Sequence, residues 1–515
     1  MLAPSILVTA RFAAGLALVA SLYLSPPASA QSGRATEAWF GVPLPGGLAP
    51  PPQLSVLREG SFSASASPVP AGEEGFAALE GEPIRALLRD IVGFSRQSRA
   101  NGDLMWGRVS GFPAAAATAD WVATQYRAAG LHDVAVQRYG ADAGMWWPNQ
   151  WEVRLLGTEA LGLGSDDVIL RSAVPARGTH IPGGMLTAPL VFAGNVDAPT
   201  DVDVRGKIAI QRIRPASGAF SLRATVSAGA EALFARGAVA VLNYIDQPGN
   251  MHVRDFGCRA CFNIGGADGA FLRAVSEGAT AAGKSQEVRI RLYLDASVRG
   301  GLIAQNVVGV VPGDSDEIVI VNAHLDGWYD ATGDNGDGLA VNVALARHFA
   351  RPENRPARIL VFVASGGHHS SGLNGPENFV RANPELAGRA VLVLNLEHIA
   401  QYLVDPNTFE VLRTEQDMGW GISNLAPFLV GLTDRARERY GFRIRGEYGT
   451  GVPGDLGRYE SLGVPRVQAI HAGPLYHTSG DVFESVSVEG LERAARFYAY
   501  FIGGVARASR SQLDP

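Results

Sequence analysis

The chain has 515 residues, a net charge of −6 and a hydrophobic fraction of 47%. This length predicts two to four domains, and the apolar content is sufficient for cores of ordinary globular size. Lysine occurs only at Lys207 and Lys284, and no run of basic residues is interleaved with aromatic ones, which argues against a nucleic-acid partner. We therefore expect small-molecule or peptide partners.

The first thirty residues have the pattern of a secretory signal peptide. A single Arg11 precedes the apolar stretch 12–24, and after a Ser-Pro-Pro break the tripeptide Ala-Ser-Ala at 28–30 stands before Gln31. We expect cleavage after Ala30 and a periplasmic or secreted protein with no membrane span. An uncleaved anchor is the alternative, although the apolar stretch is shorter than the about 20 helical residues that a span needs.

The next two segments differ in composition. Residues 31–74 are rich in Pro, Gly, Ser and Ala, which bury little apolar surface, so we interpret them as a linker. From Gly75 apolar residues recur at steps of three and four, which predicts a helix. A second helix is expected at about 114–129, followed by a strand at 134–139.

Residues 157–296 contain many short β-like runs separated by Gly and Pro, with one helical stretch at 222–237. We predict a β-rich inserted domain that divides a second domain into the segments 75–156 and 297–507. The run Val-Asp-Val-Arg-Gly-Lys-Ile-Ala at 202–209, followed by an Ala-rich helix and an apolar strand, resembles the protease-associated domain found inserted in several peptidases. A generic β-rich insert is the alternative.

The only two cysteines, Cys258 and Cys261, are separated by two residues. In an oxidising compartment this spacing favours a local disulfide that closes a tight turn. A redox-active pair is the alternative, but the motif does not open a helix after a strand. Two cysteines cannot supply an all-cysteine zinc site with four ligands.

From about residue 306 strands and helices alternate, which predicts an α/β fold: a mixed central β-sheet covered by helices on both faces. Four apolar runs, at 318–321, 359–363, 391–394 and 467–470, are each followed by residues that bind metals. In open α/β sheets ligands bind beyond the carboxyl ends of the strands. We therefore predict a metal site built from His324, His368, His369, Glu397 and His477.

The first of these strand ends carries further carboxylates. Asp326 follows His324 by two residues, a spacing that suits a metal-binding imidazole held in place by an acid. Asp334 lies in a Gly-rich loop before an apolar helix, where it could bind a metal or cap the helix.

These residues, in this order, resemble the co-catalytic zinc exopeptidases, a family that includes bacterial aminopeptidases, glutamate carboxypeptidases and glutaminyl cyclases. The resemblance implies two zinc ions per chain, or one. His324 would bind the first metal, Asp326 would orient His324, and Asp334 would bridge both metals. The segment Asn395-Leu396-Glu397 is similar to the family's Asn-Leu-Asp/Glu element, which implies that Glu397 also binds the first metal.

The end of the motif series is Tyr-His-Thr-Ser-Gly-Asp at 476–481, which is similar to the family's Tyr-His-Thr-x-x-Asp element. The resemblance implies that His477 binds the second metal. It also implies that Tyr476 donates a hydrogen bond to an oxyanion that develops during the reaction.

The chain departs from the family at His368 and His369, where the family has two glutamates, while Gly-Leu-Asn-Gly at 372–375 supports the alignment. In the family the first glutamate is the general base and the second binds the second metal. His369 can replace a carboxylate ligand. His368 is the candidate base, since imidazole titrates near 6.5, although two adjacent cations would disfavour its protonated form.

Other residues near these motifs have smaller expected roles. On a strand, His398 would point to the face opposite Glu397. His471 is a reserve ligand, and Asp455 is expected to support the site from outside the ligand set. If Asp334 is misassigned, its replacements would be Asp330 and Asp337.

We therefore expect an exported zinc-dependent hydrolase of the peptidase type, in which metal-bound hydroxide attacks the carbonyl of a peptide or aminoacyl substrate. Two alternatives remain. One is a catalytically impaired relative that binds peptides with its metal in place, and the other is a glutaminyl cyclase-like enzyme. A serine hydrolase is not expected, because no Gly-x-Ser-x-Gly elbow precedes a suitable Asp and His.

Overall fold

The protein is described by a computed structural model that places residues 71, 74–141, 143–159, 162, 164–215, 219–254, 256–370, 372–405 and 411–515. The predicted signal peptide lies outside these residues. So does the predicted linker, apart from residues 71 and 74. In the part of the chain that the structure places, no helix is both long and apolar enough to cross a lipid bilayer.

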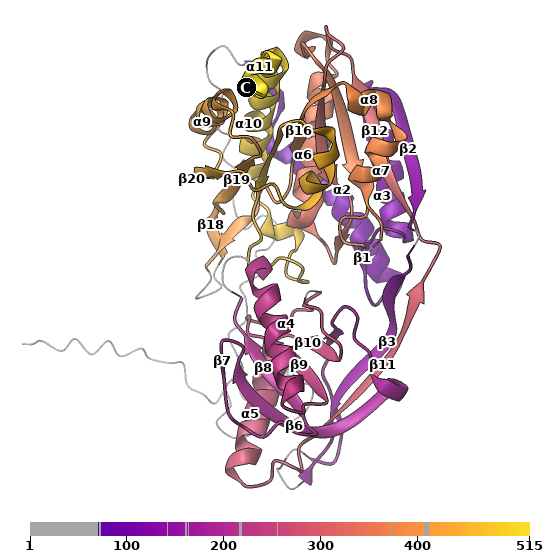
Figure 1. Ribbon diagram of the computed structural model, residues 1–515, viewed down its shortest axis with the longest axis vertical. Coiled ribbons are helices and arrows are strands. Elements are labelled where there is room, and N and C mark those ends of the chain that lie inside the picture. The colour runs from indigo at the N-terminus through magenta and orange to yellow at the C-terminus, as the bar shows by residue number, and fades with distance from the viewer. Residues whose placement is uncertain are drawn as a thin grey trace, which may run out of the picture. The chain divides into compact units, whose positions relative to one another are not determined.

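The described residues include a mixed sheet of eight strands in the order β2-β12-β15-β13-β16-β21-β19-β20. Figure 1 labels β2, β12, β16, β19 and β20 of this sheet. The four strands β15, β13, β16 and β21 lie side by side and run parallel, whereas β2 and β12 pair antiparallel with their neighbours. β19 pairs antiparallel with β21 and parallel with β20. The bounds are β2 His132–Gly140, β12 Ile303–Val311, β13 Ile318–His324, β15 Ile359–Ser365, β16 Ala390–Asn395, β19 Met418–Ile422, β20 Ile444–Gly449 and β21 Arg466–Ile470.

Strand β13 shows why this sheet is covered on both faces. All seven of its residues are buried, and near-continuous apolar runs are typical of parallel strands packed on both sides. Val319 and Val321 belong to one core, and Ile318 and Ile320 belong to another. The predicted α/β fold with helices on both faces is confirmed.

Helices from both ends of the chain form these two layers. The first core includes buried side chains of α2 Gly81–Ala100, α3 Pro113–Ala129, α6 Asp337–Phe349, α9 Pro427–Tyr440 and α10 Val488–Arg507. The second includes Phe379 of α7 Gly375–Ala382 and Tyr459 of the 3-10 helix η6 Gly454–Leu462.

The first predicted helix begins later than the apolar pattern indicates. A 3-10 helix, η1, occupies Glu74–Ala78, and α2 begins only at Gly81. Pro83 explains the difference, because proline fits the first turn of an α-helix but disrupts its interior. The second helix, α3, ends at Gly130, whose φ of 87° is the left-handed conformation that favours glycine.

Residues 145–299 contain a second sheet of nine strands, in the order β4-β3-β11-β6-β8-β9-β10-β5 with β7 paired to β6. The long ribbon β3–β11 extends beyond the predicted boundaries at 157 and 296. Strand bounds are β3 Met145–Leu155, β4 Val168–Ile169, β5 Val174–Pro175, β6 Met185–Asn195, β7 Ala198–Pro199, β8 Ile208–Ile213, β9 Ala240–Ile245, β10 Cys261–Ile264 and β11 Arg289–Arg299.

Two helices accompany this second sheet, α4 Ala219–Ala235 and α5 Gly266–Ala281 (Figure 1). Cys258 and Cys261 are joined in a disulfide. Cys261 is the first residue of β10, and Cys258 precedes that strand. We refer to residues 145–299 below as the β-rich region.

Candidate metal centre

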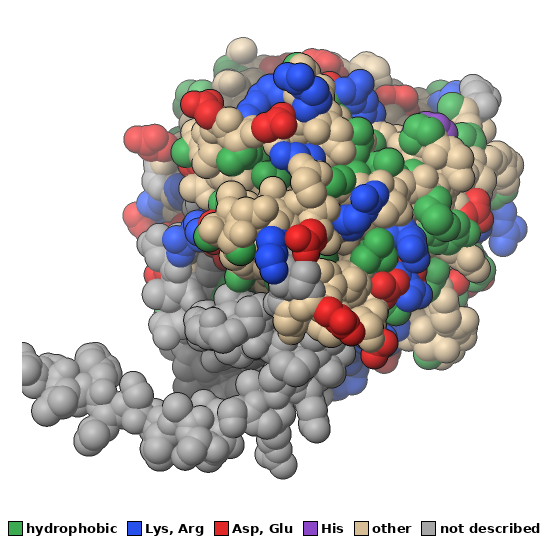
Figure 2. Space-filling view, turned by 90° about the horizontal axis from the view of Figure 1, so that it is seen from below, with side chains coloured by type: hydrophobic (Ala, Val, Ile, Leu, Met, Phe, Trp, Pro, Cys, Tyr) green, Lys and Arg blue, Asp and Glu red, His purple; other side chains and the backbone are tan. Residues whose placement is uncertain are grey.

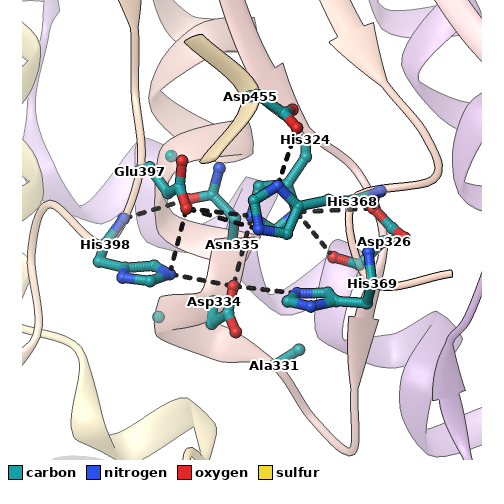
Figure 3. Close-up of polar contacts among 12 residues, drawn as sticks. His324, Asp326, Ala331, Asp334, Asn335, His368, His369, Glu397, His398 and Asp455 are labelled. Atoms are coloured by element: carbon teal, nitrogen blue, oxygen red, sulfur yellow. Dashed lines mark hydrogen bonds and ion pairs between the residues drawn. The ribbon is translucent and has the colours of Figure 1, made fainter. Parts of the chain in front are cut away.

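The carboxyl ends of the parallel strands bring the predicted ligands together. β13 ends at His324, and β15 ends at Ser365, three residues before His368. β16 ends at Asn395, two residues before Glu397, and the segment after β21 leads to His477. Since these strands run parallel, their following residues meet at one edge of the sheet (Figure 3).

Asp334 is the centre of this cluster. Its Oδ1 lies 3.3 Å from Nε2 of His324, 3.2 Å from Nε2 of His369 and 3.0 Å from Nε2 of His398. Its Oδ2 lies 3.1 Å from Nε2 of His477. Figure 3 shows His369 and His398 approaching Asp334 from opposite sides. The carboxylate is thus shared by imidazoles on both of its oxygens.

Burial alone would raise the pKa of Asp334. The charges of His369 and His398 outweigh that effect and hold the pKa well below its usual range. Asp334 is therefore a carboxylate at neutral pH, as a metal ligand must be.

The described residues contain three groups whose ligand atoms lie within 4.8 Å of one another. Two of them share Asp334, one being His324, Asp334 and His398 and the other Asp334, His369 and His477. The third consists of His324, His368 and His369.

The donor set fits zinc. Donors about 2.0–2.1 Å from a tetrahedral zinc ion are separated by about 3.3 Å, close to the 3.0–3.3 Å between Asp334 and its imidazoles. In addition, Nε2 of His324 is buried and makes no hydrogen bond within the described residues, because its 3.3 Å contact with Asp334 lacks hydrogen-bond geometry. A buried nitrogen in this state is unfavourable unless it binds something.

The structure corrects the expectation for His398. On a continuing strand it would point away from Glu397, but β16 ends at Asn395 and His398 has a φ of 56°. The alternation of a strand therefore does not apply. Nδ1 of His398 donates to the backbone carbonyl of His471, which directs Nε2 to Asp334. His471 contributes this carbonyl and its ring belongs to none of the three groups among the described residues.

Glu397 lies at the edge of the cluster. Its Oε1 is 3.9 Å from Nε2 of His324 and 3.8 Å from Nε2 of His398, while its Oε2 accepts a hydrogen bond of 2.7 Å from Asn395. Glu397, predicted as a ligand of the first metal, belongs to none of the three groups among the described residues, whereas His398, for which no ligand role was predicted, belongs to one.

Asp326 holds three parts of the centre. Its backbone carbonyl accepts a hydrogen bond of 3.0 Å from Nδ1 of His324, and its Oδ1 lies 3.6 Å from the same nitrogen. Its two carboxylate oxygens accept hydrogen bonds from the backbone N–H groups of His368 and His369, at 3.3 and 3.2 Å. Burial alone would raise the pKa of Asp326, but the nearby imidazoles of His324 and His369 lower it to about 2. Asp326 therefore orients His324 and fixes the backbone of the His-His pair.

His368 is paired with a carboxylate from another element. Its Nδ1 lies 2.9 Å from Oδ1 of Asp455 in η6, and its ring stacks on that of His324 at 4.0 Å. The other oxygen of Asp455 accepts a hydrogen bond of 2.8 Å from Ser365. The preceding Gly454 has a φ of 68°, which glycine adopts readily, and a Cβ there would lie 3.4 Å from Cε1 of His368.

Asp330 and Asp337, the replacements considered for Asp334, have other partners. Asp330 forms an ion pair of 2.8 Å with Arg96. Asp337 accepts a hydrogen bond of 2.8 Å from the backbone of Ala400, and burial raises its pKa to about 8. Neither belongs to the metal-binding groups found among the described residues.

Two supporting residues received no role from the sequence. Arg108 is fully buried and donates to the carbonyls of Leu325, Asp330 and Ala331, at 3.0, 2.8 and 2.9 Å. It therefore fixes the loop between His324 and Asp334. Asp481 accepts hydrogen bonds from the backbone of Gly333 and Asp334, at 2.9 and 3.1 Å. The one sequence signal for this role of Asp481 is its position as the last residue of the Tyr-His-Thr-Ser-Gly-Asp segment at 476–481.

A cavity of about 800 Å³ opens onto the centre. His368, His369 and His477 line it together with Tyr476, whose ring stacks on that of His477 at 3.6 Å. The remaining walls include residues of the β-rich region. The same region contacts the loop that carries His477: Arg254 donates from its backbone to the His477 carbonyl at 2.9 Å, and Val253 forms a β-bridge with Thr478.

Residues 306–502 match the family model of peptidase family M28. All the histidines and carboxylates of the centre lie within this segment. The match to this family model supports the resemblance to the co-catalytic zinc exopeptidases.

Solved structures show the same fold. A peptidase M28 precursor from Shewanella amazonensis aligns with a TM-score of 0.60 at 19% identity, over 84% of this chain and 99% of that one. A zinc aminopeptidase from Bacillus subtilis gives 0.55 at 20% identity, over 84% and 98%. An aminopeptidase from Aneurinibacillus sp. strain AM-1 gives 0.53 at 19% identity, over 86% and 98%. No curated protein sequence matches the chain.

Proposed function

We propose that this protein is an exported zinc-dependent exopeptidase that hydrolyses peptide or aminoacyl substrates. The observation that carries the proposal is the pair of three-residue groups that share the Asp334 carboxylate. His324, Asp334 and His398 would hold one zinc ion, with Glu397 beside them, and Asp334, His369 and His477 would hold the other. Such nitrogen-rich sets suit zinc.

Export is supported by the N-terminal sequence and by the Cys258–Cys261 disulfide, because disulfides persist in oxidising compartments. Bound zinc would lower the pKa of a water molecule and polarise a substrate carbonyl. The remaining steps fall to side chains that line the cavity.

His368 is the proposed proton acceptor. With Nδ1 held by the Asp455 carboxylate at 2.9 Å, Nε2 is left to take the proton from the attacking water and return it to the leaving amine. Tyr476 is the proposed donor to the oxyanion. Its stacking on His477 places it beside the group that would hold the second zinc.

The first test is metal content and turnover of the purified full chain after export. We expect about two zinc ions per chain, hydrolysis of some members of an aminoacyl and dipeptide panel, and loss of activity with a chelator that added zinc reverses. Absence of bound zinc at neutral pH would reject the proposal.

A His368→Ala variant tests the assigned base. Removal of a general base typically lowers kcat by about 10²- to 10⁴-fold, and we expect the zinc count to stay unchanged. Because His368 also belongs to a group with His324 and His369, loss of a zinc ion in this variant would instead assign it as a ligand. A Ser370→Ala variant, one residue beyond the pair, serves as the matched control.

The second candidate function is a peptide-binding protein that holds its metals without turnover. The observation that favours it is the replacement of both family glutamates by His368 and His369. Peptide binding measured by calorimetry, with zinc bound and no product from the whole panel, would select this function over hydrolysis.

A further inference from the structure

We propose that Met251, in the β-rich region, is a site of reversible oxidation, and that its sulfoxide form releases the loop that carries His477. The inference rests on the proposed role of His477 as a zinc ligand and adds a chemical condition under which that ligand is lost. It is carried by the contacts of the Met251 sulfur with this loop. Methionine sulfoxide is reduced back to methionine by dedicated reductases, so the change is reversible.

The sulfur lies at the end of a short antiparallel contact between the β-rich region and this loop. Segment 251–254 runs antiparallel to segment 477–480. Besides the contacts already described, the backbone N–H of Ser479 donates to the carbonyl of His252 at 2.9 Å, and Oγ of Ser479 accepts from the His252 N–H at 3.0 Å. This register places the first residue of one segment opposite the last residue of the other.

The sulfur is in tight contact with the loop. Sδ of Met251 lies 3.7 Å from Oγ1 of Thr478. A Cβ at Gly480 would come within 2.2 Å of the same sulfur, so the close approach requires glycine at this position. The side chain also packs against the buried apolar side chains of Val404 and Leu475. On the side of Gly480, the sulfur therefore has no space for an additional oxygen atom.

The conformation of His477 depends on contacts of this kind. Its φ of 57° is a left-handed conformation that residues other than glycine adopt only where their surroundings hold them. The hydroxyl of Thr478 closes the turn, since it donates to the carbonyl of Leu475 at 2.8 Å and accepts from the N–H of Gly480 at 3.0 Å. A hydroxyl has one proton to donate, and a thioether is a weak acceptor. A sulfoxide oxygen, which accepts more strongly, would compete for that proton and open the turn.

Exposure distinguishes Met251 from most other methionines of the described residues. Met105, Met145 and Met418 are buried, whereas Met251 is half-buried and Met185 is 56% exposed. Both cysteines are joined in the disulfide and offer no thiol. On the face shown in Figure 2, acidic and basic side chains are interspersed and neither sign gathers into one patch. Hydrogen peroxide is uncharged, so the exposure of the sulfur decides which methionine reacts.

The oxidation transfers one oxygen atom from hydrogen peroxide. A lone pair of Sδ attacks one peroxide oxygen, the S–O bond forms as the O–O bond breaks, and the other oxygen leaves as water with both protons. The sulfur is oxidised, the peroxide is reduced, and no further reactant is needed. The product is a polar group beside Leu475 and Val404, where an unpartnered polar atom is unfavourable.

The first experiment treats the zinc-loaded full chain with hydrogen peroxide and locates the oxidised methionines by mass spectrometry of its peptides. We expect the zinc count to fall from about two toward about one per chain, in step with oxidation of Met251. Far-UV circular dichroism should stay unchanged, because one loop is released and not the fold. Retention of the full zinc count in chains oxidised at Met251 would overturn the inference.

Met251→Leu and Met185→Leu form a matched pair for this experiment. Leucine conserves most of the side-chain volume and has no sulfur to oxidise. Each variant is compared with its own untreated sample. We expect peroxide to leave the zinc count and kcat of Met251→Leu at their untreated values, and to lower those of Met185→Leu as in the parent chain. Equal losses in the two variants would contradict the inference.

Met251→Gln introduces a polar group at this position without any oxidant. We expect it to weaken the binding of the second zinc ion by about tenfold relative to Met251→Leu, as loss of a contact that supports a metal ligand typically does. Competition with a chelator measures this affinity. Met185→Gln is the control and should bind zinc as the parent chain does. Equal zinc affinities in Met251→Gln and Met251→Leu would count against the inference.

The melting temperature of the metal-free chain separates this inference from the proposed function. Met251→Gln should melt at a lower temperature than Met251→Leu even without zinc, because the contacts of the sulfur do not include the metal. If this difference is found in a chain that binds no zinc, the oxidation site stands and the zinc hydrolase does not. Zinc binding and hydrolysis, with equal melting temperatures and equal zinc affinities in both variants, reject the oxidation site alone.

Discussion

The two regions that meet at the cavity contribute in different ways. The eight-stranded sheet supplies buried side chains at strand ends and in the segments that follow them, such as His324 and Asp334, which are fully or almost fully buried. The β-rich region supplies side chains from loops and one helix, among them Arg177 and Arg223. The difference indicates that the buried core fixes the side chains that would bind metal. The side chains that would contact a substrate lie on surface loops and a helix, and loops tolerate sequence variation.

The sharpest way to break this comparison is to remove the shared carboxylate. We expect Asp334→Asn to lower zinc content below about one ion per chain and activity by more than about 100-fold, because both metal groups lose a ligand. Elemental analysis and the peptide assay measure the two effects. Asp330→Asn is the matched control in the same loop, and an equal loss in that variant would contradict the assignment of Asp334.

The His-His pair gives the next largest effect. His368→Glu restores the family's residue, yet we expect it to lower kcat by about tenfold or more, because the new carboxylate would face Asp455 at the position of a 2.9 Å contact and like charges repel. The double variant His368→Glu with Asp455→Asn should recover part of the loss. A rise in kcat for the single variant would mean that the pair is a degraded base, not an adapted one.

A variant of Arg108 tests whether this buried side chain stabilises the loop between His324 and Asp334. Arg108→Ala leaves three buried carbonyls without their donor, and we expect a loss of stability of about 3 kcal/mol or more. The melting temperature, measured with and without zinc, reports this change. The exposed Arg99→Ala should change it by much less, and a similar shift in both variants would remove Arg108 from the supporting set.

Removal of the disulfide should have the smallest effect of the four changes. We expect it to lower the stability of the β-rich region alone. For so short a loop, replacing Cys258 and Cys261 by serine should cost about 2 kcal/mol. We expect a lower melting temperature with kcat unchanged at saturating zinc, since the metal-binding groups contain no residue of that region. A loss of zinc from the serine variant would show that the metal centre depends on the stability of the β-rich region.

The sequence was sufficient for the sheet and for most of the centre. Apolar runs of β13, β15 and β16 end where buried strands end, so His324, His369 and the residues after Asn395 could be placed at one sheet edge. The fold class, the family and the disulfide followed from patterns that are local in the chain.

What the sequence did not reveal depends on the three-dimensional path of the backbone. His398 was assigned to the wrong face because its left-handed φ was not predictable from strand alternation. Arg108 contacts backbone carbonyls, which leave no mark in the sequence. The arginines of the cavity come from segments far apart in the chain, and nothing local links them.

The β-bridge between Val253 and Thr478 has a thermodynamic consequence. The same loop that pairs with the β-rich region carries His477, one of the imidazoles on Asp334. If zinc binding favours the paired arrangement of this loop, then the pairing must favour zinc binding by the same free energy. Metal affinity and the pairing of this loop would then be two readouts of one equilibrium.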